Sequence, residues 1–74
     1  MEKIDLRDSI NFLSMLRACA AISALAPGAC LAIVSNDDDL LPDLRRVHPE
    51  CRYQPLPVFA GRPGDYAFGV EKTF

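Results

Sequence analysis

The first hydrophobic positions of the chain alternate with charged ones. Ile4 and Leu6 are apolar, whereas Lys3, Asp5 and Arg7 are charged. A period of two is typical of a strand that buries one face. The opening segment is therefore predicted to be a short strand at the surface of a sheet.

After this strand the hydrophobic period lengthens to that of a helix. Apolar residues recur at Met15, Ala18, Ile22 and Leu25, and Pro27-Gly28 follows. This spacing places one apolar stripe on a helix, and a Pro-Gly pair ends a helix. Ser9 is a favourable N-cap residue for its first turn. We expect the helix to begin within a few residues of Ser9 and to end at Leu25.

Four further segments complete the pattern. They are a strand at Cys30–Ser35, a helix at about Leu40–Val47 that Asn36–Asp39 cap, a strand at Tyr53–Phe59 and a strand at Tyr66–Lys72. A loop at Gly61–Asp65 joins the last two strands as a hairpin. The second strand should place Leu31 and Ile33 on one face, with Cys30, Ala32 and Val34 on an open one.

These elements predict an α+β two-layer sandwich in the order β-α-β-α-β-β. The first two strands should be parallel because a helix connects them, and the last two should be antiparallel. The third strand should lie at an edge, since Pro55 and Pro57 cannot donate to a ladder. The result is one domain over residues 1–74, with a four-stranded mixed sheet and two helices on one face.

Composition and charge narrow the function. Half of the residues are hydrophobic and the net charge is −2, so a packed core is expected and neither nucleic acid nor an anionic membrane is favoured as a partner. The apolar run Ala18–Val34 is broken by Pro27-Gly28, which argues against a membrane span. Three cysteines cannot close a disulfide framework, which indicates the reducing cytoplasm.

Several segments follow one another as they do in a known family. They are Asp5-Leu6-Arg7, the apolar helix ending at Leu25, Pro27-Gly28, Leu31–Val34 before Asn36-Asp37, Asp43-Leu44 and Tyr66–Lys72. In this order the chain resembles the TusA/SirA-like sulfur carriers over essentially its whole length. The resemblance implies the same two-layer architecture and a place in sulfur relay.

The chemical motif of that family is incomplete in this chain. The family opens with Asp-x-Arg-Gly-Leu-x-Cys-Pro-x-Pro, and Asp5 and Arg7 match it. The glycine, the cysteine and the two prolines are replaced by Asp8, Asn11, Phe12 and Ser14, respectively. In the family the cysteine holds sulfur as a persulfide, and an asparagine amide has no such chemistry. The resemblance therefore implies the fold of a carrier without its sulfur-carrying residue.

The roles of Arg7 and Asn11 can each be interpreted in two ways. Asn11 could donate a hydrogen bond at the positively poised helix start and so bind an anion or a partner, or it could be a solvent-facing polar residue. Arg7 could take part in binding, or it could belong to the solvated face of its strand.

The three cysteines are the alternative candidates for sulfur chemistry. Cys51 follows Pro49-Glu50 in a loop near Arg46, His48 and Arg52, which could lower its thiol pKa. Cys30 is predicted to be a small, packed apolar residue of its strand. Cys19 lies two turns into the first helix, too far along it for the dipole at the helix N-terminus to lower the pKa of its thiol. A zinc site from His48 and Cys51 would need remote elements to converge, so no metal or other cofactor is predicted.

The first helix has an unusual lack of charge. Arg17 is the only charged residue between Asp8 and Asp37, and Leu13, Leu16, Ala20 and Ala24 form a second apolar stripe. One sheet cannot cover both stripes, so exposed apolar area is expected. The favoured hypothesis is a protein-binding or regulatory module, or a homo-oligomer, that uses Leu13, Leu16 and Ala20. The alternative is an active persulfide carrier or sulfurtransferase that uses Cys51.

Overall fold

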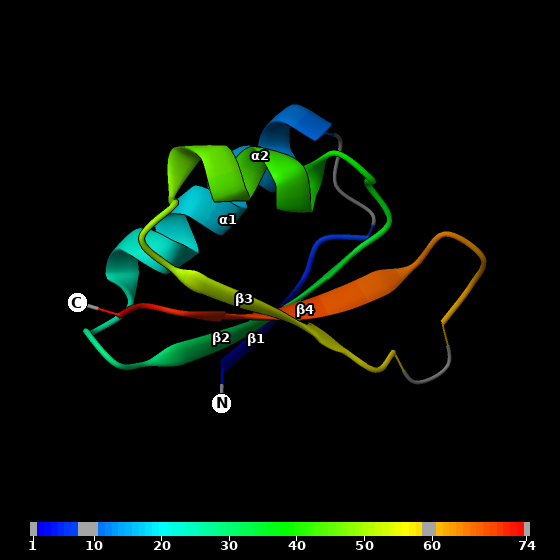
Figure 1. The fold of residues 1–74 in the computed structure, drawn as a ribbon. Helices are drawn as coiled ribbons and strands as arrows, with labels where there is room; N and C mark the ends of the chain where they lie inside the picture. The colour runs from blue at the N-terminus through cyan, green and yellow to red at the C-terminus, as the bar shows by residue number, and fades with distance from the viewer. Residues whose placement is uncertain (1, 8–10, 59–60, 74) are drawn as a thin grey trace.

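The predicted order of elements is present in the computed structural model, which describes residues 2–7, 11–58 and 61–73. Its elements are β1 (Glu2–Asp5), α1 (Asn11–Ala24), β2 (Cys30–Ser35), α2 (Leu40–Val47), β3 (Arg52–Leu56) and β4 (Tyr66–Glu71). Figure 1 shows both helices on one side of a single sheet, as the α+β two-layer sandwich requires.

The sheet has the strand order β1-β2-β4-β3. β1 and β2 are parallel, with Ile4 opposite Ile33, whereas β4 is antiparallel to both of its neighbours. β3 lies at an edge as predicted, and Pro55 pairs in register with Phe68. Because proline has no amide hydrogen, this edge offers few donors to a further strand.

Two strands differ in their bounds from the prediction. β3 spans Arg52–Leu56 rather than Tyr53–Phe59, so Pro57 lies after the strand and not inside it, and Phe59 lies outside the described residues. β4 ends at Glu71 because the backbone of Lys72 bonds to a loop instead of a strand. Its amide donates to the Ala29 carbonyl at 3.0 Å, and its carbonyl accepts from the Gly28 amide at 2.6 Å. Gly28 has a positive φ of 85°, which suits the Pro-Gly turn after α1.

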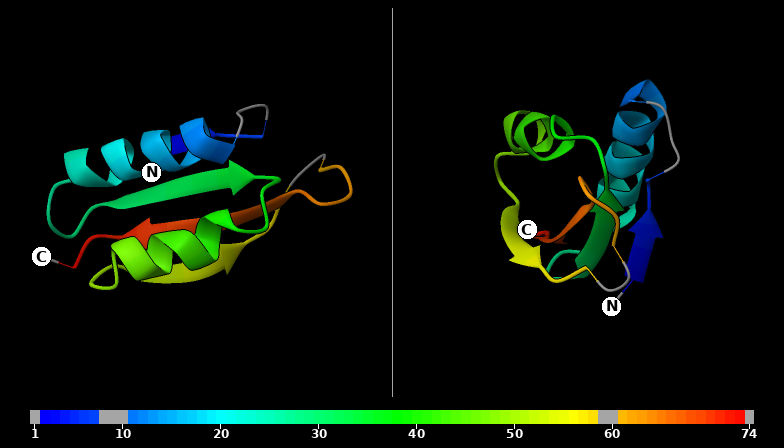
Figure 2. Two further views of the ribbon diagram at one scale, coloured as in Figure 1. Left: turned by 90° about the horizontal axis from the view of Figure 1, so that it is seen from above. Right: turned by 90° about the vertical axis from the view of Figure 1, so that its right-hand side faces the viewer.

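The core lies between the sheet and the two helices (Figure 2). The sheet contributes buried Leu31, Ile33, Phe68 and Val70, and the helices contribute Ala18, Ile22, Leu40 and Leu44. These positions confirm the apolar stripe predicted for α1 and the inward face predicted for β2. Phe68 is flanked by Tyr66 and Tyr53, with ring centroids 5.8 and 6.4 Å away.

The helix ends are held by side chains from distant strands. The Lys72 ammonium donates to the carbonyls of Ile22, Ser23 and Leu25 at 3.4, 3.3 and 3.1 Å. A cation at this position contacts the carbonyls at the C-terminal end of α1, of which the Ile22 carbonyl also accepts from the Leu25 amide at 3.1 Å.

The start of α2 is arranged differently from the predicted cap. Asp39 is the N-cap residue but makes no side-chain capping bond. Instead, the Asp37 carboxylate accepts from the Asp39 amide at 3.0 Å, and the Tyr66 hydroxyl donates to the Asp37 carbonyl at 2.6 Å. This turn is therefore fixed by Asp37 and by β4.

Candidate functional site

The junction before α1 is where the family would hold its cysteine. Asn11 is the first residue of α1, so the predicted position at a helix N-terminus is confirmed for its backbone. Residues 8–10 and the Asn11 side chain lie outside the described residues. The N-cap role of Ser9 and the binding role of Asn11 therefore stay predictions. Ser14, where the family has its second proline, is fully buried in α1.

Arg7 is occupied by two carboxylates. Its Nε and Nη2 donate to Asp5 at 3.0 and 2.6 Å, and its Nη1 donates to Asp65 at 3.2 Å. These bonds raise the pKa of Arg7 and lower the pKa of Asp5 to about 2. Most of the guanidinium donors are thus used inside the protein. This arrangement supports a structural role for Arg7 more than the binding role that the family pattern suggested.

Asp65 is a residue that sequence reasoning missed. Its side chain is only 2% exposed and accepts from the Arg62 backbone amide at 2.9 Å as well as from Arg7. The Arg62 amide bond, followed by the bond from Arg7, lowers the pKa of Asp65. The carboxylate therefore ties the turn before β4 to Arg7, which follows β1.

The outer face of α1 is apolar and uncovered. Phe12, Leu13 and Leu16 are 71%, 46% and 52% exposed, and Ala20 and Ala24 are exposed as well. The predicted exposed apolar stripe is confirmed, and Phe12 extends it towards the start of the helix. Arg17, which is also exposed, lies among these residues on the helix. Exposed apolar side chains gathered on one side of a small domain are typical of a protein contact surface.

Cys51 does not have the environment that its neighbours in sequence suggested. It is 7% exposed and belongs to the core cluster beneath the helices. Burial, followed by the nearby Glu50 carboxylate, raises the pKa of the Cys51 thiol. Lys72 and Tyr53 act in the opposite direction and are outweighed. The expectation of a lowered pKa from Arg46, His48 and Arg52 is therefore wrong.

The other two thiols also differ in setting. Burial raises the pKa of Cys19, which is half-buried on α1. Cys30 is half-buried too, but it belongs to the helix-free face of the sheet rather than to the core, which corrects the prediction of a packed residue. None of the three cysteines of the chain forms a disulfide.

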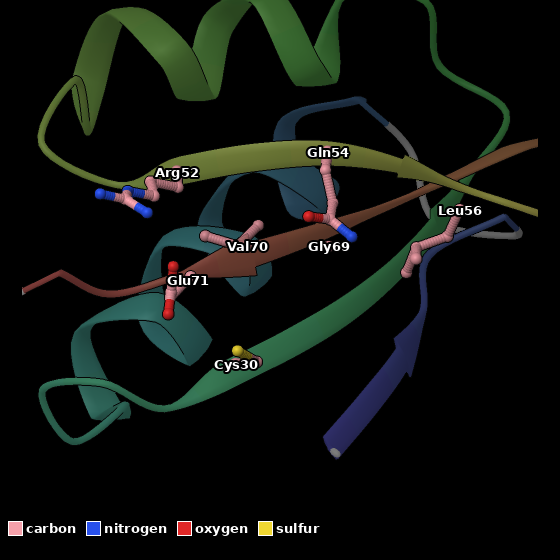
Figure 3. A pocket seen from close by; sticks show the side chains of 7 residues that line it. All are labelled: Cys30, Arg52, Gln54, Leu56, Gly69, Val70 and Glu71. Carbon is pink, nitrogen blue, oxygen red and sulfur yellow. The ribbon is translucent and has the colours of Figure 1, made fainter.

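A hollow of about 230 Å³ opens on the helix-free face of the sheet (Figure 3). It forms above Gly69 of β4, where the absent side chain leaves space between β2 and β3. Arg52 and Glu71 lie at one end of the hollow, Gln54 at its middle and Leu56 at its other end (Figure 3). The thiol of Cys30 completes the wall on the β2 side.

The other half of this face is less open than expected. Val34 is only 6% exposed, whereas the alternation predicted it on an open face with Cys30 and Ala32. Val34 shares a second hollow of about 200 Å³ with Pro57 and Val58. The chain after β3 thus turns beside β2 and narrows the open face at this end.

Residues 2–7, 11–58 and 61–73 contain no group of three or more side chains placed to hold a metal ion. Within the same residues, no helix has both the length and the apolar character needed to cross a membrane. Searches of protein-family models and of curated proteins find no match to this chain. The resemblance to the sulfur carriers therefore stands on the residues and the order of segments quoted above.

Proposed function

We propose that the chain is a TusA/SirA-like domain without the sulfur-carrying cysteine, which acts as a protein-binding or regulatory module related to sulfur relay. The observation that carries this proposal is the exposed apolar face of α1, formed by Phe12, Leu13, Leu16 and Ala20. Its unpaired cysteines fit a reducing compartment, and we propose that it acts in the cytoplasm.

The strength of such a contact can be bounded from exposure. Burying a Leu or Phe side chain completely contributes about 1.5–3 kcal/mol, and these three residues still expose between 46% and 71% of their surface. Covering Phe12, Leu13 and Leu16 would yield roughly 2.5–5 kcal/mol before the cost of association. The face therefore suits a transient contact, or one part of a larger interface.

The missing thiol supports a non-catalytic role. A persulfide carrier needs an accessible thiol that ionises near neutral pH. Asn11 lies at the helix start but its side chain carries no sulfur. Cys51 carries a thiol, but this thiol is buried and its pKa is raised. The alternative, an active carrier that uses Cys51, would depend on a thiol that is only 7% exposed, although it lines a surface hollow with Arg45, Pro49 and Tyr53.

Sedimentation of the wild-type chain and two variants tests the contact surface. We expect the wild-type chain to self-associate at high concentration and Leu16→Glu to abolish this association. Val47→Glu is the matched control, because Val47 is similarly exposed at 56% but lies at the end of α2. A monomeric wild type, or equal effects of both substitutions, would contradict self-association through α1.

Mass spectrometry tests the role in sulfur chemistry. After incubation with a cysteine desulfurase and cysteine, we expect no stable sulfur adduct on the native chain. A persulfide on Cys51 would overturn the non-catalytic proposal in favour of the active carrier.

A further inference from the structure

The hollow above Gly69 is bounded by polar side chains that have no partner in the described part of the chain. Arg52 and Glu71 face each other across β3 and β4. Arg52 and Glu71 nevertheless form no ion pair and no side-chain hydrogen bond with any described residue. The side chain of Gln54 also forms no hydrogen bond with a described residue. Arg7 and Arg46, by contrast, are both paired with carboxylates.

The floor of the hollow is apolar and leaves room for an atom group of limited size. A Cβ built on Gly69 would lie 3.5 Å from Leu56 Cδ1 and 3.7 Å from Gln54 Cγ, which is ordinary contact. The glycine is therefore not required by crowding within the protein. A volume of about 230 Å³ corresponds to roughly eight water molecules at ~30 Å³ each.

We propose that this hollow binds a small zwitterion of the α-amino acid type. The Arg52 guanidinium receives the carboxylate as a two-donor fork, and the Glu71 carboxylate receives the ammonium group. The ligand side chain lies over Gly69 towards Leu56, so an apolar side chain is preferred. The site satisfies one positive and one negative protein group with a single molecule of fitting size.

The area of the face is too small for a stable protein interface on its own. Four strands spaced about 4.8 Å apart and about five residues long present on the order of 300 Å² of sheet. A stable interface buries about 800 Å² on each partner. A nucleotide is too large for the volume, and it lacks a positive group for Glu71.

This inference does not rest on the proposed function, because the hollow and the exposed face of α1 lie on opposite layers of the molecule. Substitutions of Leu16 therefore do not alter the hollow above Gly69. An experiment that contradicts one of the two proposals leaves the other unaffected. An open site for so few atoms is expected to bind with a dissociation constant on the order of 1 mM.

Titration of the ¹⁵N-labelled full chain by NMR tests the site, with three probes. L-leucine carries both charges, N-acetyl-L-leucine lacks the ammonium group and L-leucinamide lacks the carboxylate. We expect L-leucine to shift the amide signals of Cys30, Gln54, Gly69 and Glu71 saturably. Both capped probes should bind at least fivefold more weakly.

Two surface substitutions separate the two charge contacts. Arg52→Gln should weaken L-leucine at least fivefold and leave L-leucinamide unchanged, whereas Glu71→Gln should weaken L-leucine and leave N-acetyl-L-leucine unchanged. Lys3→Gln is the control, because Lys3 lines only the second hollow. Gly69→Ala should weaken binding by filling the floor.

The proposal is overturned if L-leucine causes no saturable shifts well above the expected dissociation constant. Shifts that map elsewhere, or capped probes that bind as well as L-leucine, overturn it equally.

Discussion

Removing the Lys72 ammonium should weaken the fold through α1, although Lys72 lies at least 47 residues away in sequence from the carbonyls that it contacts. Lys72→Met keeps most of the aliphatic stem and deletes the charge. Cations at a helix C-terminus contribute about 0.3–1 kcal/mol when exposed and up to ~2 kcal/mol when partly buried. The three contacts, at 3.1–3.4 Å, are longer than strong charge-assisted bonds, so we expect a loss of about 1 kcal/mol.

Urea denaturation followed by circular dichroism measures this loss. In a domain of this size, about 1 kcal/mol corresponds to a decrease of roughly 4–8 °C in Tm. Lys72→Arg should retain much of the stability, and high salt should shrink the difference between wild type and Lys72→Met. Lys3→Met, which removes an exposed ammonium with no such contact, should change stability by less than about 0.5 kcal/mol. If Lys72→Met and Lys3→Met behave alike, the capping argument is refuted.

Three further predictions concern the chemistry of single groups. Asn11→Cys should create a thiol with a pKa below that of free cysteine, because position 11 is the start of α1. A thiol titration that shows no decrease in pKa would mean that the N-terminus of α1 does not stabilise a thiolate. Asp5 has a folded pKa of about 2, below its ordinary value of 3.8, so it contributes stability above about pH 4 that is lost as the pH falls towards 2. Asp5→Asn should therefore flatten this part of the acid unfolding curve, and an unchanged curve would contradict the Arg7 pairing. In the native chain Cys30 should react with a thiol reagent faster than Cys51, as peptide mapping would show, because Cys30 is half-buried whereas Cys51 is buried. Equal rates would contradict this difference in exposure.

The architecture was predictable because it depends on periods that the sequence displays directly. The apolar run at Cys30–Ser35 and the helical spacing from Met15 to Leu25 each identify one element. The buried stripe of the helix is confirmed, whereas Val34 is buried on the strand face that was predicted to be open. The two prolines after Tyr53 place β3 at an edge without any knowledge of its neighbours, and the structure confirms this position. The exposed stripe on α1 followed from counting apolar residues against the single sheet available to cover them.

The side-chain contacts were harder to predict because they join residues far apart in sequence. The residues next to Lys72 in the sequence give no sign that its ammonium contacts the end of α1. The residues next to Asp65 likewise give no sign that its carboxylate binds Arg7. Cys51 was misjudged since its neighbours in sequence are polar, whereas the residue itself turns under the helices into the core. The hollow above Gly69 arises from three strands at once, and the only local signal was a glycine inside a strand.

The central position of β4 has a consequence for how the chain acquires its structure during synthesis. β4 is the last strand in the sequence, yet it lies between β2 and β3 and supplies Phe68 and Val70 to the core. Until residue 71 has been added, β3 has no partner strand and β2 has only β1. Nascent chains that stop short of this point thus expose the apolar faces of both helices and depend on chaperones or proteases. The domain should therefore gain its stability in one step, once β4 is complete, rather than by stepwise addition of folded parts.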